Sequence, residues 1–200
     1  MRYHYDIWTK PDENGISLID RILRKLVETE RQKNKRSSKT TMIIVDSKSI
    51  QNVYTAENKG YDAGKNFRNK TAYRRRCSGT CSCNQITTAN VTDRNGAIKM
   101  VNYYCDVTDN LSQIKKVLVD GGYTGQKFAD EINKISSAEV EVVKRNELHT
   151  FSVLPKRWIV ERSFGWLDEC RRLWKNCERL LQNSFQMVSL AFILIILRKY

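Results

Sequence analysis

Two short stretches decide the fold: MIIVDS at residues 42–47 and VLVDGGY at residues 117–123. Each is an apolar, β-branched run that ends in an aspartate, which is typical of a short buried strand followed by a turn. A third run, VEVV at residues 140–143, has the same character. Helical patterns lie between and around these runs, so the sequence predicts an α/β protein with at least partly parallel strands.

Helical periodicity is clearest at both ends of the chain. Apolar residues from Ile19 to Val27 recur at three- and four-residue steps, and Ser17 stands where a helix cap is expected. Residues 157–181 are predicted as one long helix rich in Trp and Arg. Residues 184–200 are predicted as a final helix that is apolar nearly all round and therefore buried.

The domain organisation follows from these patterns. Residues 1–40 are predicted as a helical N-terminal part with a basic linker, and residues 41–200 as the main, catalytic-type domain.

The charge balance indicates the kind of partner. The 200 residues carry 35 Lys and Arg against 22 Asp and Glu, which is a formal net charge of +13. Such an excess favours a polyanion partner, most simply nucleic acid. No apolar run approaches the ~18 residues of a membrane-spanning helix, and no apolar secretory segment follows the N-terminus. We therefore expect a cytoplasmic protein with no membrane partner.

Acidic residues stand at the ends of the two deciding strands. Asp46 and Asp120 each follow an apolar run, and ligands of α/β sheets gather beyond the carboxyl ends of strands. Two such carboxylates could share a hard divalent cation. The alternative is that both are ordinary turn formers, since Asp favours turns. Further on, Arg157 and Glu161 are four residues apart on one helical face, either as a surface ion pair or as groups beside a substrate phosphate.

The strings VDSKSI, NKGYDAGK, VLVDGGYTG and LPKRWIVERSFGWL resemble a bacterial DDE-type insertion-sequence transposase, from about residue 5 to residue 198. The resemblance implies an RNase H-like catalytic fold, a mixed sheet flanked by helices. Carried over to this chain, the three catalytic and metal-binding acids are Asp46, Asp120 and Glu161. The Lys that some branches carry seven residues after the Glu is not matched, because Asp168 stands there.

The resemblance also implies the chemistry and the partners. The three acids would hold Mg²⁺, with Mn²⁺ as a substitute, for cleavage and transfer of DNA strands. Double-stranded DNA, as the element's ends and its target, would contact Arg157, Arg162, Arg171 and Arg172. A homodimer acting at the nucleoid of a prokaryotic cell is the expected working form.

Two departures from the family pattern stand out. Family members carry a further helical segment ahead of the region where this chain starts, so the sequence resembles an N-terminally truncated member. Residues 66–86 should supply an antiparallel strand pair. They instead read NFRNKTAYRRRCSGTCSCNQI, without alternation and with few apolar residues. The sequence therefore predicts a disrupted strand pair and weak or absent activity.

Two explanations for residues 66–86 remain open. Cys77, Cys81 and Cys83 could bind zinc, although their spacing fits no common structural zinc pattern. Alternatively, the reading frame was lost just after Lys65 and regained near Ile86. Read one nucleotide along, permitted codons allow KISGIKRHIAVD followed by VQGLAHAI, which is strand, turn and strand. The frameshift hypothesis is excluded if the gene's nucleotide sequence contains no single-base shift that yields this peptide.

The sequence leaves three functions to compare. The first is a metal-dependent DNA transposase or its inactive remnant. The second is a non-catalytic, basic nucleic-acid-binding protein. The third is a small zinc-binding regulator, which depends on the cysteines alone.

Overall fold

The computed structural model of the chain describes residues 2–54, 56–57, 60–61, 67–76, 81–107, 114–143 and 157–198. Its elements, in chain order, are α1 (Arg2–Thr9), α2 (Leu18–Lys33), β1 (Met42–Gln51), β2 (Gly60–Tyr61), β3 (Phe67–Arg76), β4 (Cys81–Thr88), α3 (Asp93–Val107), β5 (Lys116–Asp120), the 3₁₀ turn η2 (Gly121–Tyr123), α4 (Gln126–Ser136), β6 (Glu139–Val143), α5 (Arg157–Asp168) and α6 (Leu181–Leu197). Among these described helices, none combines the length and the apolar character needed to cross a membrane.

Six strands form one mixed sheet with β1 near its centre. β3 pairs with β1 in antiparallel orientation, and β5 pairs with the other edge of β1 in parallel. β6 continues the sheet in parallel beyond β5, while β2 and β4 both pair antiparallel with β3. The predicted α/β class with partly parallel strands is therefore confirmed. An antiparallel pair beside β1, followed by parallel strands, is the sheet expected of the RNase H-like fold.

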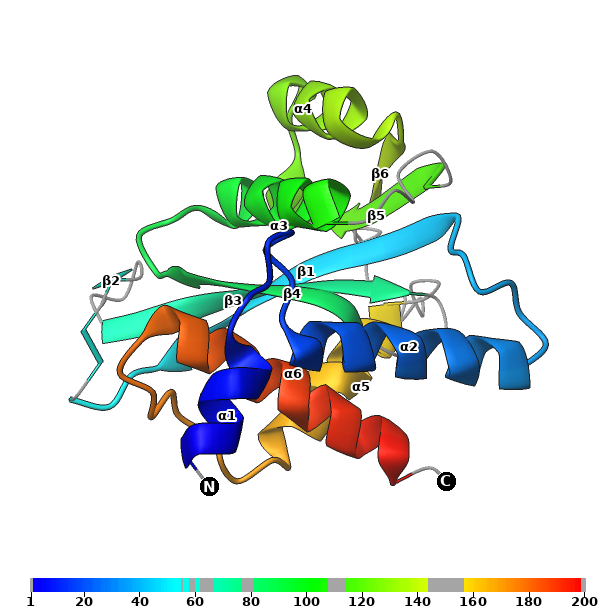
Figure 1. The fold of residues 1–200 in the computed structure, drawn as a ribbon. Coiled ribbons are helices and arrows are strands. Elements are labelled where there is room, and N and C mark those ends of the chain that lie inside the picture. The colour runs from blue at the N-terminus through cyan, green and yellow to red at the C-terminus, as the bar shows by residue number, and fades with distance from the viewer. Residues whose placement is uncertain are drawn as a thin grey trace.

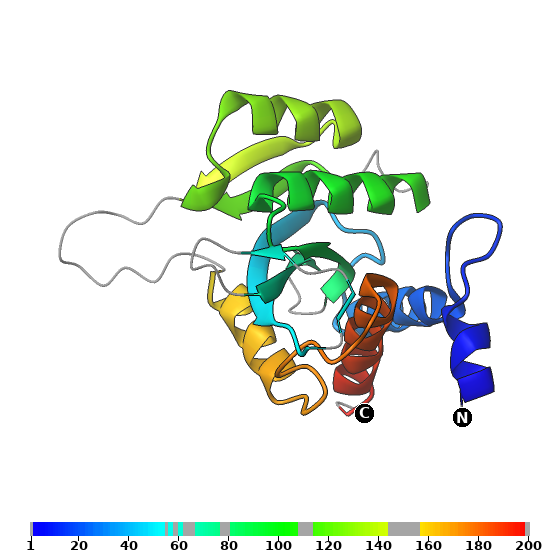
Figure 2. The ribbon, with the colours of Figure 1, turned by 90° about the vertical axis from the view of Figure 1, so that its left-hand side faces the viewer.

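Helices cover both faces of this sheet, so the molecule has three layers (Figures 1 and 2). α3 and α4 pack on one face, against a core that includes Ile43 and Val45 of β1. α2 and α6 pack on the other face around Phe192. Ile44, which points opposite to its neighbours in the strand, packs with Leu118 and with Phe164 of α5. α5 therefore lies on the same face of the sheet as α2 and α6.

The strand pair predicted to be disrupted is present. β3 pairs with β1 from Arg76 opposite Ile43 to Arg68 opposite Gln51, and β4 pairs with β3 in turn. The prediction was wrong because ladder hydrogen bonds need only main-chain N–H and C=O groups, and residues 66–86 contain no proline. The backbone of these strands is therefore present. Weak or absent activity was expected because the strands would be lost, and that reason does not hold for the backbone.

The proposed zinc ligands are not covered by the structure. Cys77 lies outside the described residues, and the side chains of Cys81 and Cys83 do as well. The frameshift hypothesis concerns the gene and stays a prediction.

The predicted long helix after residue 157 is shorter than expected. α5 ends at Asp168, and residues 169–175 form turns. The backbone beyond them bonds instead to the segment after β1: Asn176 donates its N–H to the carbonyl of Gln51, and Val53 donates to the carbonyl of Asn176. Trp174, in these turns, is 65% exposed.

The predicted N-terminal helix is confirmed as α2. Ser17 caps it, because its hydroxyl accepts a hydrogen bond from the N–H of Asp20 at 3.2 Å. Leu23 and Val27 of this helix are buried in the core that α2 shares with α6. α2 is thus packed into the fold as tightly as the helices of the main domain.

We predict that Leu23→Ala lowers the free energy of unfolding by about 2–5 kcal/mol, because Leu23 is only 3% exposed. Ile22→Ala is the matched control in the same helix, since Ile22 is 42% exposed, and it should cost less than about 1 kcal/mol. Urea unfolding, compared at constant slope, measures both. Equal losses for the two variants would contradict the packing described for α2.

Candidate active site at the ends of strands β1 and β5

The register between β1 and β5 brings the two predicted aspartates to one place. The parallel ladder pairs Ile44 with Leu118. Asp46 comes two residues after Ile44, and Asp120 comes two residues after Leu118. Because side chains alternate along a strand, Asp46 and Asp120 lie on the same face as Ile44 and Leu118. That face is the one that packs against Phe164 of α5. The sequence-based expectation of neighbouring carboxylates thus matches the register.

β5 ends at Asp120 as predicted, but β1 continues past Asp46 to Gln51, because β3 pairs with it as far as that residue. Local hydrogen bonds hold each of the two carboxylates in place. Oδ1 of Asp46 accepts the N–H of Ser47 at 2.8 Å, and Asp46 is half-buried. Oδ1 of Asp120 accepts the N–H of Gly122 at 2.9 Å and so caps the turn η2. A Cβ at residue 122 would lie 3.1 Å from Oδ1 of Asp120, which explains the glycine there. Asp120 is exposed, and an ionised carboxylate can accept several further bonds beyond the one that the turn uses.

Tyr123 supports the site from within the core. It is 2% exposed and packs on Phe128 with ring centroids 5.7 Å apart. Burial raises the pKa of the Tyr123 hydroxyl well above its usual value, and the negative charges of Asp46, Asp93 and Asp120 raise it further, whereas contact with the Ser47 side chain acts in the opposite direction. Tyr123 therefore keeps its proton and stays neutral. Its role was not predicted from the sequence, although it directly follows the DGG string.

The third predicted acid lies on α5. The backbone of this helix is described, but the side chains of Arg157 and Glu161 lie outside the description. Residue 161 is three positions before Phe164 and therefore shares the helix face that packs on the sheet. Among the side chains that are described, no three His, Cys, Asp or Glu residues gather as a metal site. The structure thus describes two of the three predicted ligands together.

The donor chemistry of this place fits a hard divalent cation. Mg²⁺ and Mn²⁺ prefer carboxylate oxygens, and Asp46 and Asp120 supply two carboxylates on one face of the sheet. A glutamate on α5 would add a third oxygen ligand of the same type.

An ion pair joins β1 to α5 beside these acids. Nζ of Lys48 bonds to both carboxylate oxygens of Asp168, at 2.6 Å from Oδ2, and lies 5.7 Å from the ring centroid of Phe164. Lys48 is two residues after Asp46 and thus on the same face of β1. The two partners are 120 residues apart in sequence, so no local pattern could have predicted the pair.

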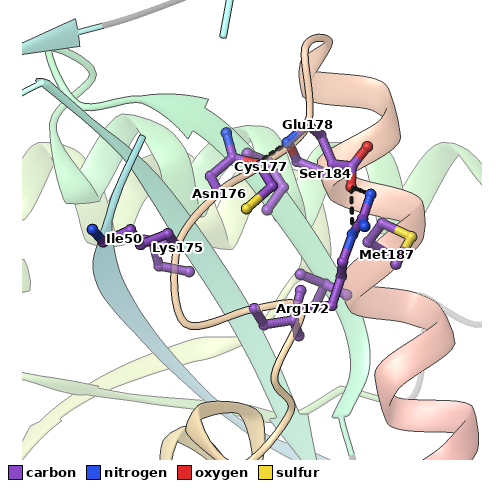
Figure 3. A pocket seen from close by; sticks show the side chains of 11 residues that line it. Ile50, Arg172, Lys175, Asn176, Cys177, Glu178, Ser184 and Met187 are labelled. Atoms are coloured by element: carbon purple, nitrogen blue, oxygen red, sulfur yellow. Dashed lines mark hydrogen bonds and ion pairs between the residues drawn. The ribbon is translucent and has the colours of Figure 1, made fainter. Parts of the chain in front are cut away.

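Three of the four arginines expected to contact DNA have described side chains, and these three differ in their surroundings. Arg162 is exposed, with its guanidinium 5.1 Å from the ring centroid of Trp166, and Arg171 is exposed as well. Arg172 is bound to Glu178, with 2.9 Å between Nη2 and Oε1 (Figure 3). Its charge is therefore already matched within the chain.

The pocket in Figure 3 lies away from the acids. Its lining comes from the end of β1, the turns after α5 and the start of α6, and includes Ile50, Arg172, Asn176 and Met187. Polar side chains that line the pocket bond to one another. For example, Oδ1 of Asn176 accepts a hydrogen bond from the hydroxyl of Ser184 at 2.7 Å. The pocket thus reflects packing between these elements.

Comparison with known proteins identifies the family. A family model described as the transposase DDE domain matches residues 37–196, so the chain belongs to this family and to the functional class of DNA transposases. Transposases of this kind use divalent metal ions. The chain is also similar to the catalytic domain of the Mos1 mariner transposase, at 13% identity and a TM-score of 0.46, over 95% of this chain and 91% of that one. It is similar as well to the Mos1 mariner paired end complex with Mn, at 13% sequence identity and a TM-score of 0.40. That match covers 95% of this chain and 61% of the other. A search of curated proteins finds no match.

Tyr123 gives this site a pH dependence with a definite sign. A tyrosine whose pKa is raised by folding keeps its proton when the unfolded chain loses it near pH 10. The native state is therefore increasingly disfavoured above about pH 10, by up to about 1.4 kcal/mol per pH unit. We predict that Tyr123→Phe flattens the decline of unfolding free energy above this pH, as measured by urea unfolding. Tyr54→Phe, at a position 93% exposed, is the control. If the unfolding free energy of the wild type and of Tyr123→Phe declined with the same slope above about pH 10, the buried environment described for Tyr123 would be contradicted.

Proposed function

We propose that this chain catalyses the metal-dependent cleavage and transfer of DNA strands of an insertion sequence. One observation carries the proposal: Asp46 of β1 and Asp120 at the end of β5 each follow, by two residues, a pair matched in the parallel ladder, and they lie on the face that α5 covers. Helix α5 contains Glu161 in its second turn. We assign Asp46, Asp120 and Glu161 as the catalytic acids and as the metal ligands.

The three acids would hold two Mg²⁺ ions, with Mn²⁺ as a substitute. Such ions, when bound, activate a water or a 3′-hydroxyl and stabilise the leaving oxygen of an in-line displacement. The protein's own part is to hold three carboxylates in fixed positions. Capping of the turn by Asp120 restricts that carboxylate, and the neutral Tyr123 adds no charge to a place that must bind cations.

Basic side chains would bind the DNA backbone through its phosphates. We assign Arg157, Arg162 and Arg171 to such contacts, and we expect a smaller contribution from Arg172 because Glu178 already neutralises it. The net charge of +13 supports binding to a polyanion. Binding should weaken steeply as salt rises, because each phosphate contact releases counterions. An element has two ends, and we propose a homodimer that holds them at the nucleoid.

A non-catalytic, basic DNA-binding protein is the alternative. It would bind DNA through the same arginines but would not need the acids. Metal-dependent cleavage that disappears when any one of the three acids is replaced separates the two functions. No described residue supports the zinc-binding regulator.

We predict that Asp120→Asn abolishes strand cleavage, by at least about 100-fold, while DNA affinity changes less than about threefold. The amide oxygen of Asn can still accept the N–H of Gly122, so the turn is kept while the charge for the metal is lost. Cleavage of a labelled duplex with the element's ends, in Mg²⁺, measures the first effect, and a binding titration measures the second.

Asp130→Asn on α4 is the control for this experiment, because it removes an equal charge from an exposed position. It should cleave as the wild type does. Cleavage by Asp120→Asn at the wild-type rate, or DNA binding without metal-dependent cleavage in the wild type, would favour the non-catalytic alternative.

A further inference from the structure

Helix α5 must be held in place for its glutamate to meet the aspartates of the sheet. The chain enters α5 at residue 157, and its N-terminal half carries residue 161. Two described side chains of α5 touch the sheet face that bears Asp46: Phe164 packs against the cluster of Ile44 and Leu118, and Asp168 bonds to Lys48. Leu167, 4% exposed, is buried in the core around α6. The side chain of Leu167 ties the helix to α6, whereas Phe164 and Asp168 tie it to β1.

We propose that Lys48 is a positioning residue whose ion pair with Asp168 sets α5, and with it Glu161, against the strand that carries Asp46. The inference rests on the proposed function, because it concerns the same metal site. Lys48 and Asp168 would act through the helix and would touch neither metal nor DNA.

The spacing along the two elements supports this role. Residues 161, 164 and 168 share one helix face, and residue 161 lies about 10 Å along the axis from residue 168, at 1.5 Å per residue. On β1, Asp46 lies about 7 Å from Lys48, and Ile44 about 13 Å. Since Phe164 packs against the pair of Ile44 and Leu118 and its ring centroid lies 5.7 Å from Nζ of Lys48, the helix follows the strand from Lys48 back towards Ile44. The position of residue 161 therefore falls beside the stretch from Asp46 to Ile44.

Lys48 and Asp168 make more contacts than a single surface ion pair. Both carboxylate oxygens of Asp168 bond to the same ammonium, and the Phe164 ring lies under it at 5.7 Å. The side chain of Lys48 is 32% exposed, so part of its length is covered. Such a contact couples the ends of two elements that are 120 residues apart in sequence. Its loss should loosen α5 without unfolding the sheet.

Two measurements on the whole protein test the proposal. Hydrogen exchange followed by mass spectrometry reports the opening of residues 157–168, and titration with Mn²⁺, followed by the electron paramagnetic resonance of the free ion, reports metal affinity. Lys48→Gln and Asp168→Asn should each speed exchange in α5 by about three- to fivefold and weaken Mn²⁺ binding by a similar factor. The double variant should be no worse than either single one, because both remove the same contact. Lys48→Arg should stay near wild type in both measurements.

The ion pair of Lys116 with Glu141 supplies the control. It has a similar length, 2.7 Å between Nζ and Oε2, and joins β5 to β6 without touching α5. Glu141→Gln should leave both the exchange of α5 and the Mn²⁺ affinity unchanged. The proposal is overturned if Lys48→Gln and Asp168→Asn behave like this control, or if their effects simply add in the double variant.

The proposed function and the positioning role of Lys48 can fail separately. If the wild type binds no Mn²⁺, the proposed function fails, and the exchange of α5 alone then decides whether Lys48 holds the helix. If the wild type binds Mn²⁺ but neither variant changes its affinity, the proposed function stands and the positioning role of Lys48 is wrong.

Discussion

The main-chain ladder between β1 and β5 sets Ile44 opposite Leu118, and the chemistry of the site depends on this register. An aspartate follows two residues later in each strand, inside β1 and at the last residue of β5, so both carboxylates lie on the same face of the sheet. A slip of one residue in either strand would turn one of the aspartates towards α3 and α4. The apolar side chains that fix the register are therefore as necessary for the site as its acids.

The proposed site also needs an element from elsewhere in the chain, because the third proposed acid, Glu161, lies on α5. Apolar packing of Phe164 on Ile44 and Leu118 places this helix on the correct face, and the pair of Lys48 with Asp168 restrains its far end. Apolar packing and the ion pair stabilise the position of α5 in different ways. Burial supplies most of the attraction without direction, whereas a charged pair with two hydrogen bonds is directional and fixes the offset along the strand.

The positive charge of the chain is only partly available to DNA. Ion pairs engage Arg172 with Glu178, Arg179 with Glu57, and Lys116 with Glu141, so these cations are matched within the fold. A formal net charge counts all of them alike. Arg162 and Arg171 are exposed near the end of α5.

Much of the fold could be predicted from local patterns. Apolar runs that end in aspartate located β1 and β5, and the periodicity after Ser17 located α2, because these patterns reflect burial of one strand or one helix face. The place of Asp120 at the end of β5 followed from the same reasoning, whereas β1 continues past Asp46 to Gln51.

Features that depend on distant partners could not be predicted. β3 forms although its side chains show no strand pattern, since its main chain completes the ladder of β1. α5 ends at Asp168 because the next segment bonds to residues after β1. The ion pair of Lys48 joins residues 120 positions apart, which no local pattern encodes.

An anomalous diffraction map of crystals soaked in Mn²⁺ locates the metal relative to named side chains and so tests the proposed metal site. We expect Mn²⁺ bound between the carboxylates of Asp46 and Asp120, with Glu161 of α5 as a further ligand. Mn²⁺ absent from these carboxylates, or bound to other residues alone, would show that they do not form the metal site.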